Sequence, residues 1–473
     1  MISRREIFGV LGAIPLADVL SPGRLFAQTA TAFPKRLLGR TGRTVVPLAL
    51  GGQASLQWTK PGIDPADIIV RAVQLGLNYL DTANGYGPSQ MNYGEAFRRL
   101  HLTPTDTNYD LALRQRLFLA TKTGSRYALD PAGKVPSAID ELKRSLTQIF
   151  GDGKGFIPEG AYLDSIQLHH LTTMPDVDQA FEGYAERSSK RPERIGALAG
   201  LLDYRDGTNY TGLNPERKHY VRHIGITGHQ SSPVLMSAIR RDSENVIDTL
   251  LVALNANDRV CSSHQNNVLP LAISRGLGVI AMKVFADGAY YGKEPRFSRT
   301  PDDVILSVGK ADAIGYSDLV RYSLSLPGVS CAIIGTGSIN REKPGADQMV
   351  ANLTAALKDM PSEIERDRIE KESAARHGAA TNYFQEKTNT LVQPASVNVK
   401  RDGERAIVEW TTAIAGREPV RSYEVRAGNK TILSLPFRPQ MYEAPLSVSL
   451  PASALGTDTV TVVASEAPPR TVA

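Results

Sequence analysis

Four side chains that together could perform acid–base chemistry each follow an apolar stretch of this sequence. Asp81 and Tyr86 lie in one glycine-rich turn, and Lys122 and His169 end two later stretches. A tyrosine with a pKa of about 10 is a slow proton donor at neutral pH, but a buried ammonium nearby stabilises its phenolate. A buried ammonium in turn requires a carboxylate partner. The four residue types therefore indicate a proton-transfer site.

An alternation of strands and helices from about residue 45 to residue 358 positions these residues. Eight strand–helix units in roughly 320 residues predict a decorated (β/α)8 TIM barrel. The near-continuous apolar strands agree, because strands of such a barrel are buried on both faces. The predicted strands are residues 45–51, 78–83, 116–123, 163–171, 221–227, 249–255, 278–285 and 329–335. The predicted helices are residues 65–75, 89–100, 138–150, 177–189, 233–241, 263–275, 317–326 and 348–358.

Two connections, residues 190–220 and 287–316, are too long for simple turns. The second follows the seventh strand, on the rim where barrels of this kind carry their active sites. Tyr290 and Tyr291 at its start could form an aromatic wall, or could be incidental tyrosines of a surface loop.

Two adjacent histidines end the fourth strand, and the strand period distinguishes them. Ser165 and Gln167 share the parity of His169, whereas Ile166 and Leu168 share that of His170. Because the polar set should face the barrel axis, His169 is predicted to point at the site. His170 is then expected at the periphery or the rim.

The two ends of the chain are predicted to lie outside the barrel. Residues 1–32 are close to the twin-arginine export pattern, with Arg4 and Arg5 before an apolar stretch and small residues at the end. This predicts a periplasmic or secreted protein; the alternative is a cytoplasmic protein whose first 32 residues are no signal. The expected barrel domain is residues 33–360, followed by a helical linker, residues 361–390.

From residue 391 to 473 the composition changes to short alternating strands separated by turn residues. About 80 residues with six or seven such strands predict a small all-β sandwich. Trp410, followed by the run from Tyr423 to Val425, resembles a fibronectin type III or related immunoglobulin-like domain. Trp410 is expected in the core of this domain. The domain could provide a contact to a protein or a glycan.

In its strand-end residues the chain from about 33 to 357 resembles the aldo-keto reductases. The resemblance implies that Tyr86 is the proton donor, that Lys122 perturbs its pKa, and that Asp81 pairs with the lysine. It implies that His169 orients the carbonyl oxygen of a small substrate. Trp58, in the loop after the first strand, is expected to line the substrate pocket or to anchor that loop.

The same resemblance implies a nicotinamide cofactor, NADPH in preference to NADH. Gly335, Thr336, Gly337 and Ser338 end the eighth strand, where backbone N–H groups can hold phosphate. Arg341 and Asn352 fall where the family holds the adenosine phosphate and the adenine.

The nicotinamide contacts depart from the common pattern of the family in three strands. Strand five offers Thr227 where a Ser-Asn pair is usual, and strand six offers Leu251 where a glutamine is usual. Strand seven gives Met282 and Lys283 where an aromatic residue usually stacks on the nicotinamide. Thr227 could still bond the carboxamide, and Asn255 or Lys283 could compensate.

Composition excludes several other classes of protein. The net charge of +5 is small for 473 residues and the basic residues are dispersed, so no nucleic-acid partner is indicated. Two cysteines form no disulfide framework and lack metal-ligand spacing, so no metal is predicted. No stretch after residue 32 approaches the 18 apolar residues of a membrane span.

Two functions therefore remain. The first is an NAD(P)H-dependent oxidoreductase that reduces aldehydes or ketones to alcohols by hydride transfer. The second is an exported, nicotinamide-binding sensor or partner-binding module with little turnover, which the altered nicotinamide contacts and the appended β domain favour.

Overall fold

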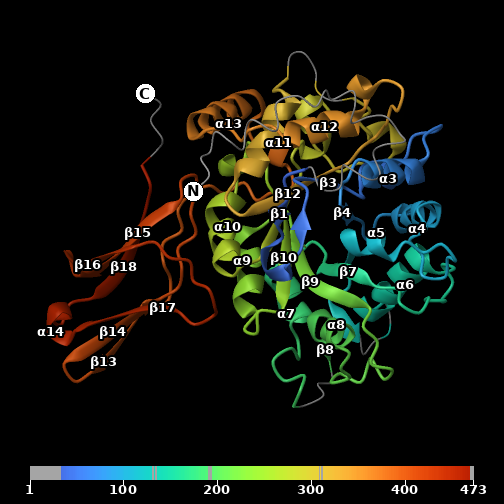
Figure 1. Ribbon diagram of the computed structural model, residues 1–473. Coiled ribbons are helices and arrows are strands. Elements are labelled where there is room, and N and C mark those ends of the chain that lie inside the picture. Colours follow the sequence, from blue (N-terminus) through green and yellow to red (C-terminus); the bar gives the residue numbers. More distant parts are fainter. Residues whose placement is uncertain are drawn as a thin grey trace, which may run out of the picture.

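The computed structural model describes residues 33–129, 133, 136–189, 194–307, 309 and 313–468. It contains a closed barrel of eight strands and, beside it, two small antiparallel sheets (Figure 1). The predicted export signal, residues 1–32, lies outside the described residues. Within the described part of the chain, no helix is both long and apolar enough to cross a membrane.

The barrel strands are all parallel and closed in the order β10-β11-β12-β3-β4-β5-β7-β9. The predicted TIM barrel is therefore confirmed. The strands are β3 (Leu48–Leu50), β4 (Tyr79–Asp81), β5 (Phe118–Thr123), β7 (Leu163–Leu168), β9 (Val221–Gly228), β10 (Ile247–Ala253), β11 (Gly278–Met282) and β12 (Val329–Ile334).

A layer of helices covers the barrel strands (Figure 1). The helices are α3 (Pro65–Gln74), α4 (Ser89–Arg99), α5 (Leu111–Arg116), α6 (Ala138–Phe150), α7 (Met174–Ala180), α8 (Ala197–Asp206), α9 (Ser232–Arg241), α10 (His264–Ser274), α11 (Tyr316–Ser325), α12 (Gln348–Ala356) and α13 (Glu363–His377). Their apolar faces and the strands form one large core.

The predicted helix at residues 177–189 is wrong in its bounds. α7 begins at Met174 because Thr173 caps it in a capping box with Asp176, and residues 181–189 form turns. The helix that packs between α6 and β9 is α8, which lies in the connection expected to be irregular.

A short hairpin, β1 (Arg36–Leu37) and β2 (Thr44–Val45), lies at the start of the barrel strands. Its turn passes so close to Gly278 that a Cβ on Gly39 would lie 2.1 Å from the Gly278 nitrogen. Gly39 also has a φ of +51°, which a glycine adopts with little cost. The turn therefore fits against the barrel only with glycine at this position.

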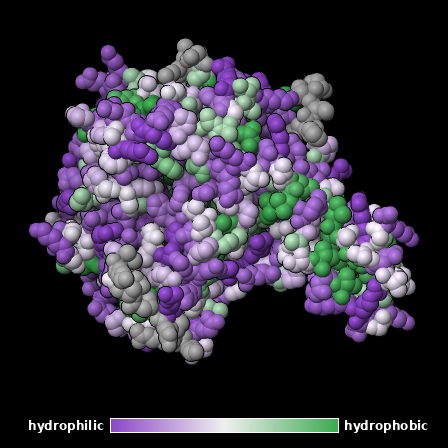
Figure 2. Space-filling model, turned by 180° about the vertical axis from the view of Figure 1, so that it is seen from behind, coloured by the Kyte–Doolittle hydropathy of each residue, from purple (hydrophilic) through white to green (hydrophobic). Residues whose placement is uncertain are grey.

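The C-terminal domain has two three-stranded sheets around their own core, as a small sandwich does. Trp410 in this core is 1% exposed and packs edge-on against Tyr423. Behind the molecule, hydrophobic residues gather on this domain, whereas the barrel surface is mostly hydrophilic (Figure 2). The strands are β13 (Asn398–Asp402), β14 (Arg405–Trp410), β15 (Val420–Ala427), β16 (Lys430–Pro436), β17 (Leu446–Pro451) and β18 (Val460–Glu466), with α14 (Ala452–Leu455) after β17.

The β domain is attached to the α9–α10 side of the barrel by polar contacts (Figure 1). Asn267 of α10 donates to the carbonyl of Ala415 at 3.0 Å and accepts from its N–H at 2.7 Å. Arg259 pairs with both Glu370 of α13 and Glu418 of the β domain. The two domains and α13 thus meet at one guanidinium group.

The stretch expected to be a helical linker contributes to the barrel. Ile369 of α13 is fully buried in the barrel core. After α13, residues 378–386 cross the mouth of the barrel, and Phe384 packs with Met282 and other side chains of the barrel interior. We call residues 378–386 the closing segment.

Candidate active site

Asp81 and Lys122 form a buried ion pair at the ends of β4 and β5. Parallel pairing places Asp81 beside Ala120, two residues from Lys122. The lysine Nζ lies 2.7 Å from both carboxylate oxygens and donates to the Thr82 carbonyl at 2.8 Å. Burial raises the pKa of Asp81 and lowers that of Lys122, and each partner opposes the shift of the other.

Tyr86 lies in the turn after β4 with its ring against this ion pair. The Lys122 Nζ is 4.7 Å from the centroid of the ring. Burial raises the pKa of Tyr86 well above its usual value, and the charges of Asp81 and Asp287 add to the shift. The lysine was expected to lower this pKa, but burial and the two carboxylates outweigh its effect. The phenol is therefore protonated at neutral pH, as a proton donor must be before transfer.

His169 follows β7 and faces Tyr86. Its Nε2 lies 3.5 Å from the phenol oxygen, at the long limit of a hydrogen bond, and the two rings meet edge to face. Burial, and after it the charge of Lys122, lowers the pKa of His169 well below its usual value. The neutral imidazole can donate one hydrogen bond to a substrate oxygen.

His170 turns away from Tyr86 because its backbone is left-handed, with a φ of +57°. Its Nδ1 lies 2.8 Å from the Nδ1 of His229, and the guanidinium of Arg126 holds the carbonyl groups of both His169 and His170 at 2.9 Å. The structure thus places the four residues Asp81, Lys122, Tyr86 and His169 together and directs His170 to a separate pair.

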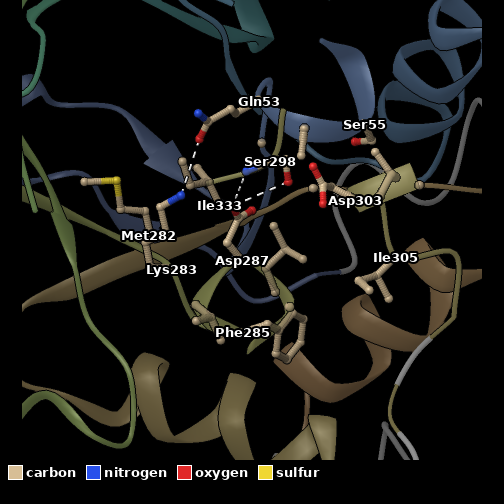
Figure 3. Close-up of a pocket in the computed structure, with 18 of the residues that line it drawn as sticks. Gln53, Ser55, Met282, Lys283, Phe285, Asp287, Ser298, Asp303, Ile305 and Ile333 are labelled. Atoms are coloured by element: carbon tan, nitrogen blue, oxygen red, sulfur yellow. Dashed lines mark hydrogen bonds between the residues drawn. The ribbon is translucent and has the colours of Figure 1, made fainter. Parts of the chain in front are cut away.

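A cleft with an empty volume of about 940 Å³, part of it open to solvent, extends from Asp81 and Tyr86 to Ile334 at the end of β12. Figure 3 shows part of its lining, including Lys283 and Ile333. Its lining comes from the loops after β3, β11 and β12, and includes Asp81 and Tyr86. Of the two rim tyrosines, Tyr291 lines the cleft, whereas Tyr290 packs on α13 and bonds to Ser373 at 2.8 Å. The aromatic wall is therefore made by one of them.

The glycine loop after β12 reaches the cleft through Gly335 and Gly337. Thr336 is 2% exposed and does not line the cleft, and the Ser338 hydroxyl donates to the Leu306 carbonyl at 2.9 Å. The Gln348 side chain accepts from the N–H of Gly337 at 2.7 Å. Of the expected phosphate-holding groups, this N–H is thus already bonded within the chain.

The predicted nicotinamide contacts on β9 and β10 are engaged by the chain itself. The Thr227 hydroxyl accepts from the N–H of His170 at 2.7 Å. The Asn255 amide donates to the carbonyls of Lys283 and Thr381 at 3.3 and 3.4 Å and accepts from the N–H of Asn257 at 2.9 Å. Neither residue lines the cleft.

Polar side chains in the loop after β10 bond to the closing segment. Besides the bond from Asn255, Gln385 donates to Asp258 at 2.9 Å, and Asn257 donates to the Thr381 hydroxyl at 3.0 Å. Backbone bonds join Glu386 to Gln230 and to Ser262 at 3.0 and 2.8 Å. The loops after β9 and β10 therefore support the closing segment.

Of the remaining predicted site residues, Lys283 lines the cleft, whereas Trp58 and Arg341 do not. Lys283 lines the cleft next to Met282. Trp58 does not line it, and its buried indole N–H has no hydrogen-bond partner within the described ranges. Arg341 points away to an exposed pair with Asp67 at 2.6 Å, the kind of ion pair that contributes at most about 1 kcal/mol.

Several observations fit a bound dinucleotide on the β3–β12 side of the cleft. The Ser55 hydroxyl is buried in the lining without a partner among the described residues, and Gly335 leaves space toward it. The amide of Asn352, one helical turn from Gln348, is also buried, and neither of its polar atoms has a partner in the described structure. Buried polar groups normally bond, so the Ser55 hydroxyl is available to a ligand, whereas Asn352 does not line the cleft.

Four further residues of the barrel mouth were not predicted from the sequence: Gln53, Ser55, Phe297 and Phe384. Gln53 and Ser55 follow β3, and their position at a strand end was a usable signal. Phe297 and Phe384 lie in long irregular stretches, and no periodic pattern marks them.

Comparisons with known proteins match the part of the chain that holds Asp81, Tyr86, Lys122 and His169, which we call the tetrad. Residues 48–188 match the Aldo/keto reductase family model, and this range contains Asp81, Tyr86, Lys122 and His169. A curated relative, the uncharacterized oxidoreductase YqkF of Bacillus subtilis (strain 168), is 28% identical over 141 residues. That alignment covers 28% of this chain and 39% of the relative, so the chain spans about two fifths of the length of the relative it matches.

Solved structures of aldo-keto reductases are also similar. One from Bacillus halodurans, in its holo form, is 21% identical with a TM-score of 0.44 and covers 72% of this chain and 96% of its own. One from Klebsiella pneumoniae in complex with NADPH is 18% identical with a TM-score of 0.43 and covers 71% and 94%. The family match over residues 48–188 supports a relationship to the aldo/keto reductases.

Proposed function

We propose that this protein is an NAD(P)H-dependent oxidoreductase that interconverts small aldehydes or ketones and their alcohols. The observation that carries the proposal is the group formed by Asp81, Lys122, Tyr86 and His169 at one end of the cleft. The family match over the residues that hold this group supports it.

The side chains have distinct tasks in the proposed reaction. The substrate oxygen lies between the Tyr86 hydroxyl and the His169 Nε2, and the neutral imidazole orients it by a hydrogen bond. When bound, the dinucleotide supplies the hydride that reaches the carbonyl carbon. The oxygen then takes the phenol proton, and the neighbouring Lys122 ammonium stabilises the phenolate that forms. Asp81 keeps that ammonium charged although it is buried.

Residues on the β3–β12 side are proposed to hold the cofactor. Gly335 offers backbone near the unpartnered Ser55 hydroxyl, a suitable place for phosphate oxygens. Asn352 offers an unpartnered amide for the adenine end. NADPH is the expected form, because Arg341 can leave its exposed pair with Asp67 to meet the additional phosphate.

A second candidate function is a nicotinamide-binding sensor or partner-binding module with little turnover. The observation that favours it is the use of Thr227 and Asn255 as supports of the chain rather than as ligand contacts. In this case the fibronectin type III-like C-terminal domain would contact a protein or glycan partner.

The site of action is proposed to be the periplasm or the extracellular space, reached by twin-arginine export. Sequencing the N-terminus of the native protein tests this. A mature chain that begins near residue 33 supports export, whereas an intact N-terminus in the cytoplasmic fraction contradicts it.

Fluorescence titration of the mature protein with NADPH and NADH, followed by a panel of carbonyl compounds, separates the two functions. Micromolar binding together with oxidation of the cofactor by an aldehyde supports the oxidoreductase. Binding without oxidation across the whole panel supports the sensor, and no binding of either dinucleotide contradicts both.

A further inference from the structure

Lys283 has an unusual backbone conformation at the end of β11. Its φ is +60°, in the left-handed region that side chains other than glycine seldom adopt. Its carbonyl accepts hydrogen bonds from the N–H of Ala286 at 2.8 Å and from the Asn255 amide at 3.3 Å. Such a conformation persists only where the surroundings fix it, and it commonly occurs at functional sites. The turn directs the lysine side chain into the cleft (Figure 3).

The charged residues that the structure describes around the cleft leave Lys283 without an ion-pair partner. Each of the three carboxylates in the lining already has a cationic partner: Asp81 with Lys122 at 2.7 Å, Asp287 with Lys293 at 3.2 Å, and Asp303 with Arg296 at 2.8 Å. Lys283 is the only lysine or arginine among the lining residues that the structure describes. Among the described residues, no carboxylate lies within 4.0 Å of its Nζ. Burial lowers the pKa of Lys283, and the more distant charge of Asp287 opposes that shift. In the described part of the chain, the cleft thus carries one lysine without an ion-pair partner.

The groups that Lys283 does touch are neutral. Its Nζ lies 3.4 Å from the Gln53 side-chain oxygen and 4.6 Å from the centroid of the Phe297 ring. An ammonium carries three donors, so two remain for a ligand. An ammonium that is partly removed from water and lacks a counter-ion favours an anionic ligand.

The position of Lys283 relative to the tetrad indicates which kind of anion the lysine binds. The Phe297 ring beside Lys283 lies 5.8 Å from the His229 ring, centroid to centroid. His229 contacts His170, the neighbour of His169, so the lysine lies on the His169 side of the cleft. The glycine loop with Gly335 and Gly337 lies at the end of β12, on a different loop of the rim. The adjacent Phe297 ring offers an apolar surface for the body of a small substrate.

We propose that Lys283 binds the carboxylate of the substrate, so that the preferred substrates are small aldehydes or ketones that also bear a carboxylate. This inference rests on the proposed oxidoreductase function. Gln53 and Phe297 position the ammonium, and the carbonyl of the same substrate then meets Tyr86 and His169.

A matched pair of substrates tests the proposal. 4-Carboxybenzaldehyde and 4-formylbenzamide have nearly the same shape, but the first is an anion and the second is neutral. The wild-type protein should have a kcat/KM at least about tenfold higher for the acid, because hydrogen bonds between charged groups are strong. Lys283→Met should abolish the difference by raising KM for the acid, with little change for the amide.

Two variants serve as controls. Lys283→Arg keeps the charge and should retain part of the preference for the acid. Lys60→Met removes a lysine whose partner is Asp302, at 3.7 Å and outside the lining, and should leave the preference unchanged. Equal kcat/KM for both substrates in the wild-type protein would overturn the proposal.

Two binding measurements separate this inference from the proposed function. Calorimetric titration with benzoate and with benzamide measures anion binding without turnover; wild type should bind benzoate more tightly, and Lys283→Met should not discriminate. The NADPH affinity of Lys283→Met, from fluorescence, should match that of wild type. If NADPH binding weakens tenfold while the acid preference persists, Lys283 serves the cofactor phosphates and the inference fails, but the oxidoreductase stands. If no carbonyl is reduced and benzoate still binds through Lys283, the proposed function fails and the anion site remains.

Discussion

The two halves of the barrel mouth use polar residues at strand ends in opposite ways. Around β4, β5 and β7, four polar side chains contact one another: Asp81, Lys122, Tyr86 and His169. Of these, Asp81 and Tyr86 line the cleft. Around β9 and β10, polar side chains bond to other parts of the chain instead. Thr227 accepts from the N–H of His170, and Asn255 donates to the Thr381 carbonyl of the closing segment. A polar residue at a strand end of a barrel can therefore serve a ligand or the chain itself, and only its partners distinguish the two.

This difference matches the extent of the family match, which ends at residue 188, before β9 begins. The matched half contains the proton-transfer group. In the other half, Thr227 and Asn255 bond within the chain, Lys283 lines the cleft, and the closing segment crosses the mouth. The comparison leads to four predictions, which are ordered by the size of the expected effect.

Replacing the proton donor should have the largest effect. Tyr86→Phe should lower kcat for carbonyl reduction by roughly 10²- to 10⁴-fold, the usual contribution of a positioned general acid. NADPH affinity should be unchanged. Steady-state kinetics and fluorescence titration measure the two quantities.

Tyr291→Phe is the matched control, because Tyr291 is a second phenol of the cleft and its hydroxyl has no partner among the described residues. Its kcat should stay within about threefold of the wild-type value, far less than a lost general acid costs. Equal losses in the two variants would show that no single phenol is the donor.

Breaking the buried ion pair should mainly affect stability. Asp81→Asn leaves the Lys122 ammonium buried without a counter-ion, which should lower the free energy of unfolding by about 3–5 kcal/mol. Urea denaturation measures this free energy of unfolding. Glu95→Gln, which breaks an exposed pair with Arg98, should change it by less than about 1 kcal/mol. If Asp81→Asn and Glu95→Gln lost similar amounts of unfolding free energy, burial would not make the Asp81–Lys122 pair more important than an exposed pair.

Loosening the closing segment should have a moderate and local effect. Gln385→Ala removes a buried donor to Asp258 and should destabilise the protein by about 1–3 kcal/mol. Amide exchange in residues 378–386 should accelerate. Gln393→Ala, which removes two bonds to Ala464 in the β domain, should leave exchange in this segment unchanged. Unaltered exchange in Gln385→Ala would mean that Gln385 does not hold the segment.

Lowering the pH should weaken the fold modestly through three histidines at the mouth. Burial lowers the pKa of His169, His170 and His229. Below pH 6.5, about the pKa of a histidine in the unfolded chain, the unfolded chain therefore binds more protons than the folded protein. The free energy of unfolding then decreases as the pH decreases. Each imidazole contributes at most about 1.4 kcal/mol per pH unit.

Denaturation curves between pH 7 and 5.5 measure this slope. His229→Gln removes one of the three groups and should reduce the slope. Because His229 contacts His170 at 2.8 Å, their two contributions are coupled. An unchanged slope in this variant would assign the pH dependence to other groups.

The sequence predicted the barrel well because its signals are local. Strands buried on both faces are continuous apolar runs, and α6 was predicted at residues 138–150, where the structure has it. The same reasoning missed the start of α7, although Thr173 and Asp176 form a readable capping box. α8 was missed because it lies in a connection treated as irregular.

The tetrad was predictable because each member lies at or just after the end of a strand, and parallel strands bring their ends together. The roles of Thr227 and Asn255 were not, because their partners are set by the tertiary structure. Asn255 bonds to Thr381, 126 positions later in the chain, and Asn257 to the same residue, 124 positions later. No periodicity or local motif encodes such a contact. The lack of an ion-pair partner for Lys283 among the described residues was likewise hidden, since it depends on which cations pair with the neighbouring carboxylates.

The closing segment also has a consequence for how the protein is made. A polypeptide leaves the ribosome from its N-terminus, and earlier parts fold first. All eight barrel strands have been synthesised by residue 334, but the supports on Asn255, Asn257 and Asp258 gain their partners only when residues 378–386 follow. A nascent chain that stops after the barrel would thus hold the tetrad beneath an uncovered mouth. Completion of the site is therefore a late event in synthesis.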